Sequence, residues 1–260
     1  MASPANEVEI RVVGLSRSGN HAIIDWLLAQ MRGRTCLLNC AEPRTNPFVT
    51  ARPLGEHEPG HRVNFDGFDL DGERHGRFSH KDYLVHTYED TFLAAFGDPF
   101  HEAKHDEWVG RSRRRFDLLV LRDPYNLLAS RLTCGFGVAA PIAVRIWCRH
   151  AREFLGLDRH LRDERVLVSY NAWASSRSYR RRVAEQLELE FDDRAAAHVP
   201  ACAGGSSFDG HGVSPCRMAL HDRWRGYTGR PDYRSVLTPE LHDLAQRIFG
   251  PLEAAEACRS

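Results

Sequence analysis

Apolar residues follow two different periods along this chain, and segments of the two kinds alternate. Short β-branched or continuously apolar runs predict buried strands. They lie at residues 8–15, 83–88, 116–121 and 165–169. Apolar side chains at helical spacing predict helices. These lie at residues 21–31, 125–132, 142–155, 178–187 and 239–249, and a further helix is expected to begin within 91–96. Strands that alternate with helices predict an α/β fold, a three-layer sandwich with a central parallel β-sheet.

One segment interrupts this alternation. Residues 42–77 combine prolines, glycines, histidines and charges with little periodicity, which predicts an irregular excursion and a candidate substrate lid. No internal repeat or obvious boundary divides the chain, so we expect a single domain over residues 1–260. Thr238 and Pro239 are suited to the N-cap and first turn of the last helix.

Composition excludes several classes of protein. Hydrophobic residues make up 42% and charged residues 27%, which is typical of a soluble globular protein. Thirty-five basic residues balance thirty-five acidic ones, which argues against a nucleic-acid partner but allows a local basic cleft. No apolar run is long enough for a membrane span, and residues 1–9 lack the pattern of a signal peptide. Seven cysteines without disulfide-like spacing favour free thiols, so we expect a cytoplasmic protein with no membrane partner and leave the oligomeric state open.

A glycine-containing loop connects the first predicted strand to the first predicted helix. Such a loop directs backbone N–H groups and the positive end of the helix dipole towards an anion. Nucleotide kinases use the pattern GxxxxGK[ST] here. Gly14 and Gly19 match its glycines, but Asn20 and His21 replace its lysine and hydroxyl residue, and the basic residue is Arg17, inside the loop. The loop therefore predicts an anion site that differs from that of a kinase.

A second candidate phosphate site follows the third predicted strand. Arg122 comes directly after the apolar residues 116–121, Asp123 and Pro124 follow, and Ser130 lies eight residues after Arg122. Ligands of open parallel sheets bind at the carboxyl ends of the strands, which is where Arg122 is expected.

The two segments resemble, in order and setting, those of sulfotransferases that use 3′-phosphoadenosine 5′-phosphosulfate (PAPS). That family's first loop reads Pro-(Arg/Lys)-Ser-Gly-Thr-(Thr/Ser), which Arg17, Ser18 and Gly19 match. Asn20 and His21 stand in place of its hydroxyl residues and can still donate hydrogen bonds to a phosphate. The resemblance implies a P-loop NTPase-like sulfotransferase fold. It also implies transfer of a sulfuryl group from PAPS to a hydroxyl or amine of a small-molecule acceptor.

The resemblance also implies further contacts with the nucleotide. Arg122 and Ser130 would hold the 3′-phosphate. Matches further along the chain, expected beside the adenine or over the 3′-phosphate, are Tyr170, Ser207, Phe208 and Arg217.

Sulfuryl transfer requires an in-line acceptor and a cation where charge builds on the leaving phosphate. Arg17 is placed for the cation's role. The acceptor also needs a general base, which the family supplies as His or Glu on the strand between the two segments. His86 is preferred because the ordinary pKa of histidine suits neutral pH, with Glu89 and Tyr88 as alternatives. We expect no metal, because the fourteen histidines form no convincing ligand cluster in the sequence.

Two other functions fit part of this pattern. A nucleotide-dependent kinase of related fold would bind ATP–magnesium, although the Lys-Ser/Thr pair of its loop is missing. An adenine-nucleotide-binding protein without catalytic activity would tolerate the departures at Asn20, His21 and Ala22. The sequence leaves the acceptor open among sugars, phenols and larger natural products.

Overall fold

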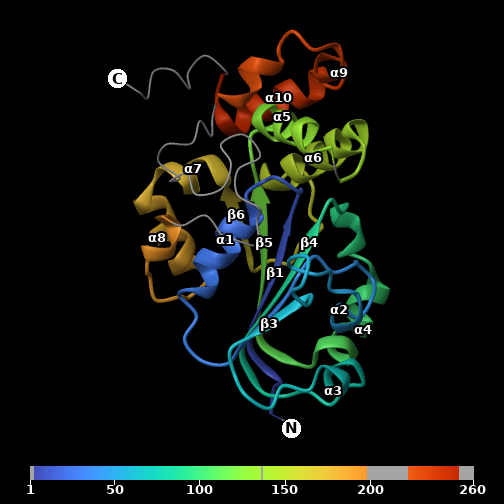
Figure 1. Cartoon of the computed structure of the whole chain (residues 1–260), viewed down its shortest axis with the longest axis vertical. Coiled ribbons are helices and arrows are strands. Elements are labelled where there is room, and N and C mark those ends of the chain that lie inside the picture. The colour runs from blue at the N-terminus through green and yellow to red at the C-terminus, as the bar shows by residue number, and fades with distance from the viewer. Residues whose placement is uncertain (1–2, 136, 198–221, 252–260) are drawn as a thin grey trace.

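The computed structural model describes residues 3–135, 137–197 and 222–251. Within these ranges the strands form one six-stranded sheet in the order β3-β2-β4-β1-β5-β6 (Figure 1). The strands are β1 Asn6–Gly14, β2 Thr35–Leu38, β3 His61–Val63, β4 Lys81–Glu89, β5 Ser112–Leu121 and β6 Arg165–Ser169. Neighbouring strands pair in parallel except β3, which is antiparallel to β2. The predicted α/β fold with a largely parallel central sheet is confirmed.

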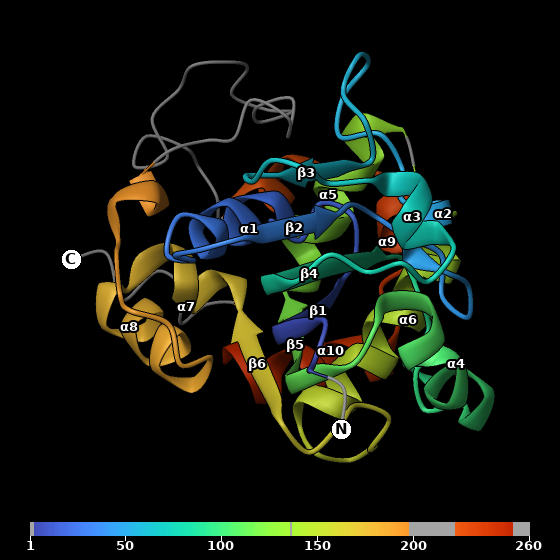
Figure 2. The same ribbon diagram turned by 90° about the horizontal axis from the view of Figure 1, so that it is seen from below.

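Helices cover both faces of the sheet and its carboxyl end. The α-helices are α1 Asn20–Leu28, α2 Pro47–Thr50, α3 Leu70–Arg74, α4 Pro99–Val109, α5 Pro124–Cys134, α6 Ala140–Phe154, α7 Tyr170–Ser175, α8 Arg177–Gln186, α9 Pro231–Arg234 and α10 Pro239–Phe249. Figures 1 and 2 show α1, α7 and α8 on one side of the sheet and α2 to α4 on the other, with α5, α6 and α10 beyond its end. None of the helices in the described ranges has both the length and the apolar character needed to cross a membrane.

Strand β1 shows why both faces are covered. Successive side chains of a strand point to opposite faces. Ile10 and Val12 pack into a cluster with Ile23 of α1, whereas Val13 packs with Phe96 in a different cluster. Because β1 is buried on both faces, its sequence is almost continuously apolar at its carboxyl end.

Several helices begin with the same capping chemistry. Thr238 accepts a hydrogen bond from the third residue of α10, as predicted. Asp123 accepts from the third residue of α5 and Asp98 from the second residue of α4, and each is followed by a proline in the first turn, Pro124 and Pro99. Each cap satisfies an N–H group that has no partner within the helix.

Residues 42–77 are more regular than expected. They contain the short elements α2 and α3 and the edge strand β3, which pairs with β2, joined by irregular segments, and their role as a substrate lid stays a prediction. The expected helix within 91–96 is a single 3-10 turn, η1 Leu93–Ala95. Further 3-10 turns are η2 Arg194–Ala197 and η5 Arg223–Tyr227.

Candidate active site

The two predicted phosphate-binding segments lie together at the carboxyl ends of β1 and β5. From β1 the chain crosses to β2, on the β4 side of the sheet, whereas from β5 it leads to β6 on the other side. Such a switch point is where ligands bind on open α/β sheets. Arg122 Nη1 donates to the carbonyl oxygen of Arg17 at 3.0 Å, and Arg17 Nε donates to Ser130 Oγ at 3.2 Å. Segments separated by 105 residues therefore form one site.

The first loop has a strained backbone. Arg17 has φ 74° and Gly19 has φ 87°, both in the left-handed region, which is uncommon for a residue with a side chain. A Cβ atom on Gly19 would lie 2.1 Å from Cε2 of Tyr170, so the tyrosine ring packs directly on the loop backbone. No side chain in the described ranges caps the start of α1, which leaves N–H groups of its first turn for an anion.

The buried hydroxyl of Ser18, in the same loop, is a second indication that the loop binds a ligand. Ser18 is 0% exposed, and its Oγ has no hydrogen-bond partner within the described ranges. A buried polar group without a partner is costly and calls for an explanation. Together with the start of α1 and the guanidinium groups of Arg17 and Arg122, it forms a donor set of N–H and O–H groups. This set fits the phosphate groups of a nucleotide.

Arg122 and Tyr170 form the wall beside the loop. Arg122 is buried and lies over the Tyr170 ring, with its guanidinium carbon 5.1 Å from the ring centroid. Trp147 of α6 donates to the carbonyl oxygen of Arg122 at 2.9 Å, and Tyr170 stacks on Trp173 with ring centroids 6.0 Å apart. Both predicted nucleotide contacts are therefore held in place by aromatic neighbours.

Asn171, where the sequence departs from the family pattern, ties this wall to α5. Its amide donates to Asp123 Oδ2 at 2.9 Å, and its Oδ1 accepts from the backbone N–H of Asp123 at 3.1 Å.

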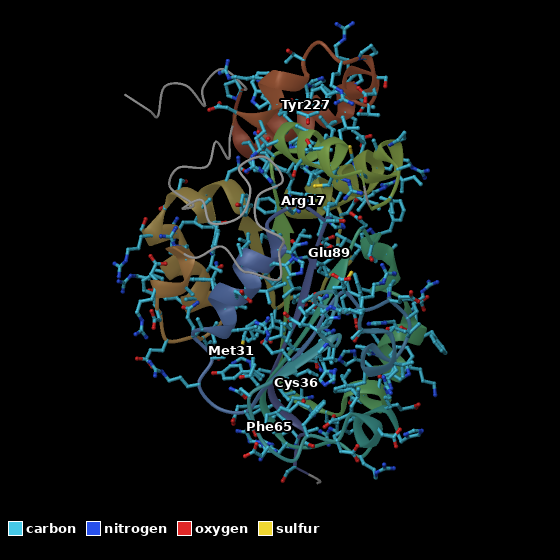
Figure 3. All side chains as sticks on the ribbon, in the orientation of Figure 1. Arg17, Met31, Cys36, Phe65, Glu89 and Tyr227 are labelled. Carbon is cyan, nitrogen blue, oxygen red and sulfur yellow. The ribbon has the colours of Figure 1, made fainter. Side chains whose placement is uncertain are left out.

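Glu89 lies at the loop. It pairs with Gly14 in the β4–β1 register, and Figure 3 shows it at the same end of the sheet as Arg17. Asn20 Nδ2 donates to Glu89 Oε1 at 2.7 Å and to the carbonyl oxygen of Leu15 at 3.0 Å. Both amide hydrogens of Asn20 are thus engaged within the protein, which leaves only its main-chain N–H for a ligand. The half-buried Glu89 is oriented towards the loop. His21 follows in the first turn of α1 and is also half-buried.

The structure does not bring His86 or Tyr88 to the loop. His86 is three residues before Glu89 on β4, so the two side chains point to opposite faces of the sheet. His86 is 0% exposed, and its burial lowers its pKa. Its Nδ1 lies 3.1 Å from the Tyr88 hydroxyl, whose pKa is raised by burial. The preference for His86 as general base therefore has no geometric support.

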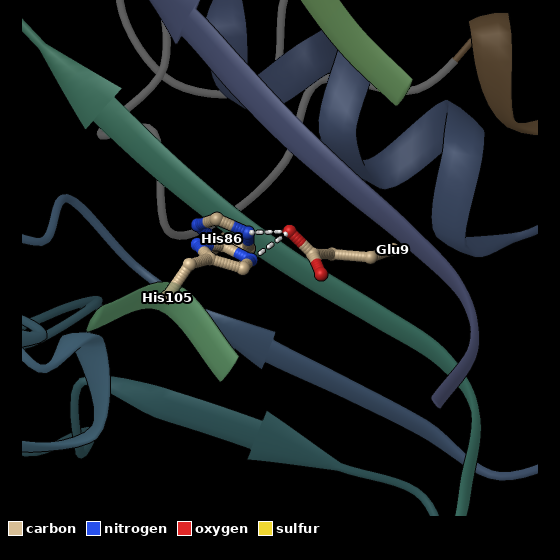
Figure 4. Close-up of side chains that lie close together, drawn as sticks. All are labelled: Glu9, His86 and His105. Atoms are coloured by element: carbon tan, nitrogen blue, oxygen red, sulfur yellow. Dashed lines mark hydrogen bonds and ion pairs between the residues drawn. The ribbon is translucent and has the colours of Figure 1, made fainter. Parts of the chain in front are cut away.

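His86 instead belongs to a buried cluster with Glu9 and His105 (Figure 4). Glu9 Oε1 lies 3.1 Å from His86 Nε2 and 2.7 Å from His105 Nε2, and one ligand atom from each residue lies within 4.8 Å of the others. Sequence reasoning did not find this group of potential ligands. It failed because the three residues come from β1, β4 and α4, which are far apart in the sequence.

The surroundings of Glu9 favour an ion network over a metal site. Arg115 Nε lies 3.4 Å from Glu9 Oε2 and Arg162 Nη1 lies 3.7 Å from Oε1, so two cations already face the carboxylate. A closed metal site would also need a fourth ligand, and the described residues offer three. Burial acts to raise the pKa of Glu9, but its interactions with His105 and His86 hold that pKa well below the usual range.

Three of the predicted nucleotide contacts, Ser207, Phe208 and Arg217, lie outside the described residues. Conversely, Asp90 and Arg131 contact the first loop. Sequence reasoning did not name Asp90, and it placed Arg131 at the end of the second phosphate-binding segment without a role of its own. Asp90 has no local signal, because its place beside the loop depends on the pairing of β4 with β1.

No family model and no curated protein matches the chain. Among solved structures, the chain is similar to the sulfotransferase domain from the Synechococcus PCC 7002 olefin synthase, with a TM-score of 0.55 and 14% sequence identity, over 93% of this chain and 94% of that domain. The sulfotransferase domain from the curacin biosynthetic pathway matches over 93% of this chain and 97% of that domain, with 14% identity and a TM-score of 0.44. The likeness to the olefin synthase domain is one of fold.

Proposed function

We propose that this chain, which has the fold of a sulfotransferase domain, transfers a sulfuryl group from PAPS to a hydroxyl or amine of a small-molecule acceptor. The observation that carries the proposal is the meeting of Arg17, Ser18, Arg122 and Ser130 in one site at the switch point of the sheet. The likeness of fold supports it independently.

In this proposal the first loop holds the 5′-phosphosulfate. Ser18 Oγ and the N–H groups at the start of α1 donate to its oxygens, and Arg17 supplies positive charge. Arg122 and Ser130 hold the 3′-phosphate, and Tyr170 lies beside the adenine. Further contacts are proposed, from the sequence alone, for Ser207, Phe208 and Arg217.

PAPS supplies the activated sulfuryl group, and the protein positions it and stabilises charge. The guanidinium of Arg17 offsets negative charge as it builds on the 5′-phosphate. We propose Glu89 as the base that takes the acceptor's proton, because its carboxylate lies at the loop and Asn20 fixes its Oε1. The hydrogen bond from Asn20 leaves Oε2 to accept that proton.

A kinase function has less support. The position of a kinase's lysine is held by Asn20, whose amide is bonded to Glu89 and to a backbone carbonyl. The donor set at the loop consists of N–H and O–H groups, and the proposed chemistry requires no metal.

We further propose a single domain that acts in the cytoplasm on a small acceptor, without a nucleic-acid or membrane partner. The cysteines in the described ranges, Cys36, Cys40, Cys134 and Cys148, carry free thiols, which suits a reducing compartment.

The proposal is tested by the preference of the protein for a 3′-phosphate. Calorimetry would compare 3′-phosphoadenosine 5′-phosphate (PAP) with adenosine 5′-phosphate, which differ only in that group. A charge-assisted contact predicts tighter binding of PAP by about 10- to 100-fold. Arg122→Ala should abolish the preference, whereas Arg149→Ala, at an exposed position on α6, should keep it. Equal affinity of the wild-type protein for the two nucleotides would refute the proposal.

Turnover is tested directly with PAPS. The protein is incubated with panels of hydroxyl and amine acceptors while release of PAP is measured. Acceptor-dependent release is expected, and its absence across sugars, phenols, alcohols and amines would count against transfer.

A further inference from the structure

An acidic residue lies directly behind the first loop because of the strand register. Gly14 pairs with Glu89, and the next backbone N–H, that of Asp90, donates to the carbonyl oxygen of Gly14 at 3.1 Å. Asp90 has φ 53°, a left-handed conformation that Asp and Asn tolerate better than most residues. Its carboxylate faces the loop: Oδ1 accepts from Ser16 N at 3.1 Å and Oδ2 accepts from Ser16 Oγ at 2.5 Å.

Arg131 of α5 meets this carboxylate from the other side. Its guanidinium donates to Asp90 Oδ1 at 2.8 Å and Oδ2 at 3.2 Å. The same group donates to the carbonyl oxygen of Ser16 at 3.1 Å and to that of Val138, which precedes α6, at 2.9 Å. One buried arginine therefore links the loop, the end of β4 and the start of α6, which its planar fork of donors allows.

Consecutive residues of α5 hold consecutive residues of the loop. Ser130 accepts from Arg17, and Arg131 donates to Ser16. The pair formed by Asp90 and Arg131 is also enclosed, because a Cβ atom on Gly137 would lie 2.6 Å from Arg131 Nη2 and 3.0 Å from Asp90 Oδ2. A buried ion pair adds little net stability, but it can fix one arrangement of the chain.

We propose that Asp90 and Arg131 are positioning residues that hold the loop over residues 15–19 in its phosphate-binding conformation; this inference rests on the proposed function. The loop contains the strained backbone of Arg17 and the buried, unpartnered hydroxyl of Ser18. Because both features are costly, contacts from outside the loop are needed to hold this conformation. Both terminal nitrogens of Arg131 are engaged within the protein, so it acts through the loop rather than on the nucleotide.

The inference predicts a selective defect. Arg122, proposed for the 3′-phosphate, donates to the carbonyl of Arg17 in the loop, but its own backbone lies at the end of β5, where Trp147 donates to its carbonyl oxygen. Loosening the pair should therefore weaken contacts with the 5′-phosphate, which the loop itself makes, far more than those with the 3′-phosphate, which touch the loop only at Arg17 among the hydrogen bonds described above.

The experiment compares two ligands that differ only in the 5′-phosphate, PAP and adenosine 3′-phosphate, by calorimetry. Asp90→Asn preserves shape and the left-handed backbone but removes the charge that faces Arg131. We expect affinity for PAP to fall by about 10-fold or more, and affinity for adenosine 3′-phosphate to stay within about twofold of wild type. Arg131→Lys, which keeps the charge but loses the fork, should show the same selective loss.

Asp117→Asn is the matched control. Asp117 is a fully buried carboxylate paired with Arg11 at 2.7 and 2.8 Å, on a part of β5 well before the site. The Asp117→Asn variant should have a lower free energy of unfolding, but its affinities for PAP and adenosine 3′-phosphate should keep the wild-type ratio. A wild-type ratio in both Asp90→Asn and Arg131→Lys would overturn the inference while leaving the proposed function intact. If the wild-type protein binds neither ligand, the proposed function fails, and the inference fails with it.

Discussion

Gly19 offers a severe test of the loop geometry, because two independent effects oppose any side chain there. Its left-handed backbone, φ 87°, costs about 1–2 kcal/mol for alanine. The new Cβ would also lie 2.1 Å from Cε2 of Tyr170, whose ring stacks on Trp173 and lies under Arg122. Overpacking of this kind costs about 1–3 kcal/mol. Gly19→Ala should therefore lower the free energy of unfolding by about 2–5 kcal/mol, a large part of a typical domain's stability.

Urea unfolding followed by circular dichroism measures this loss, and two comparisons separate its causes. Gly76→Ala is the control, because Gly76 also has a left-handed φ, 78°, but a Cβ atom added there would meet nothing within 4 Å in the described part of the chain. It should cost about 1–2 kcal/mol, from the backbone alone. In a Tyr170→Ala background, Gly19→Ala should cost no more than that, because the steric part is gone. If Gly19→Ala costs no more than Gly76→Ala in the wild-type background, the tyrosine ring does not pack on the loop.

Other predictions concern chemistry and acid stability. Arg17→Ala should lower turnover with PAPS by about 100- to 1000-fold while weakening PAP binding far less, by steady-state kinetics and calorimetry; normal turnover would remove Arg17 from the mechanism. Glu89→Gln should lower kcat by about 10²- to 10⁴-fold, whereas His86→Gln should lower only the free energy of unfolding; the opposite pattern would restore His86 as the base. Burial lowers the pKa of His150 from 6.5 to about 4. As pH falls below 6.5, the His150 imidazole is therefore protonated in the unfolded chain but stays neutral in the folded one. The free energy of unfolding should fall between pH 6.5 and about pH 4. This loss amounts to about 3 kcal/mol, and urea unfolding of His150→Gln should depend less steeply on pH over that window; an unchanged slope would refute the assignment.

The sequence predicted the main strands, most long helices and the setting of both candidate phosphate-binding segments between a strand and a helix, because these depend on local patterns. β1 and β5 are almost continuously apolar where they are buried, and the polar residues that follow them mark the site. The choice between His86 and Glu89 could not be made this way. Their spacing puts them on opposite faces of β4, but which face reaches the loop depends on pairing with β1.

Helix α4 was missed for a physical reason. Its buried residues are His101, His105 and Val109, at helical spacing, so histidines occupy positions where apolar residues are expected. Those histidines face Arg11 and Glu9 on the sheet, contacts that no local pattern predicts. The Asp98–Pro99 cap was the remaining signal for the start of this helix.

The pair formed by Asp90 and Arg131 was invisible for a similar reason. It joins the end of β4 to α5, 41 residues later, and acts on a loop 74 residues before Asp90. Only the folded sheet brings these segments together.

The central claim is that the site holds a 3′-phosphorylated adenine nucleotide. Calorimetry of the wild-type protein with PAP and, separately, with ATP–magnesium tests it most directly. The convergence of Arg17, Ser18, Arg122 and Ser130 predicts clearly tighter binding of PAP. Preference for ATP–magnesium would contradict the account and favour a kinase.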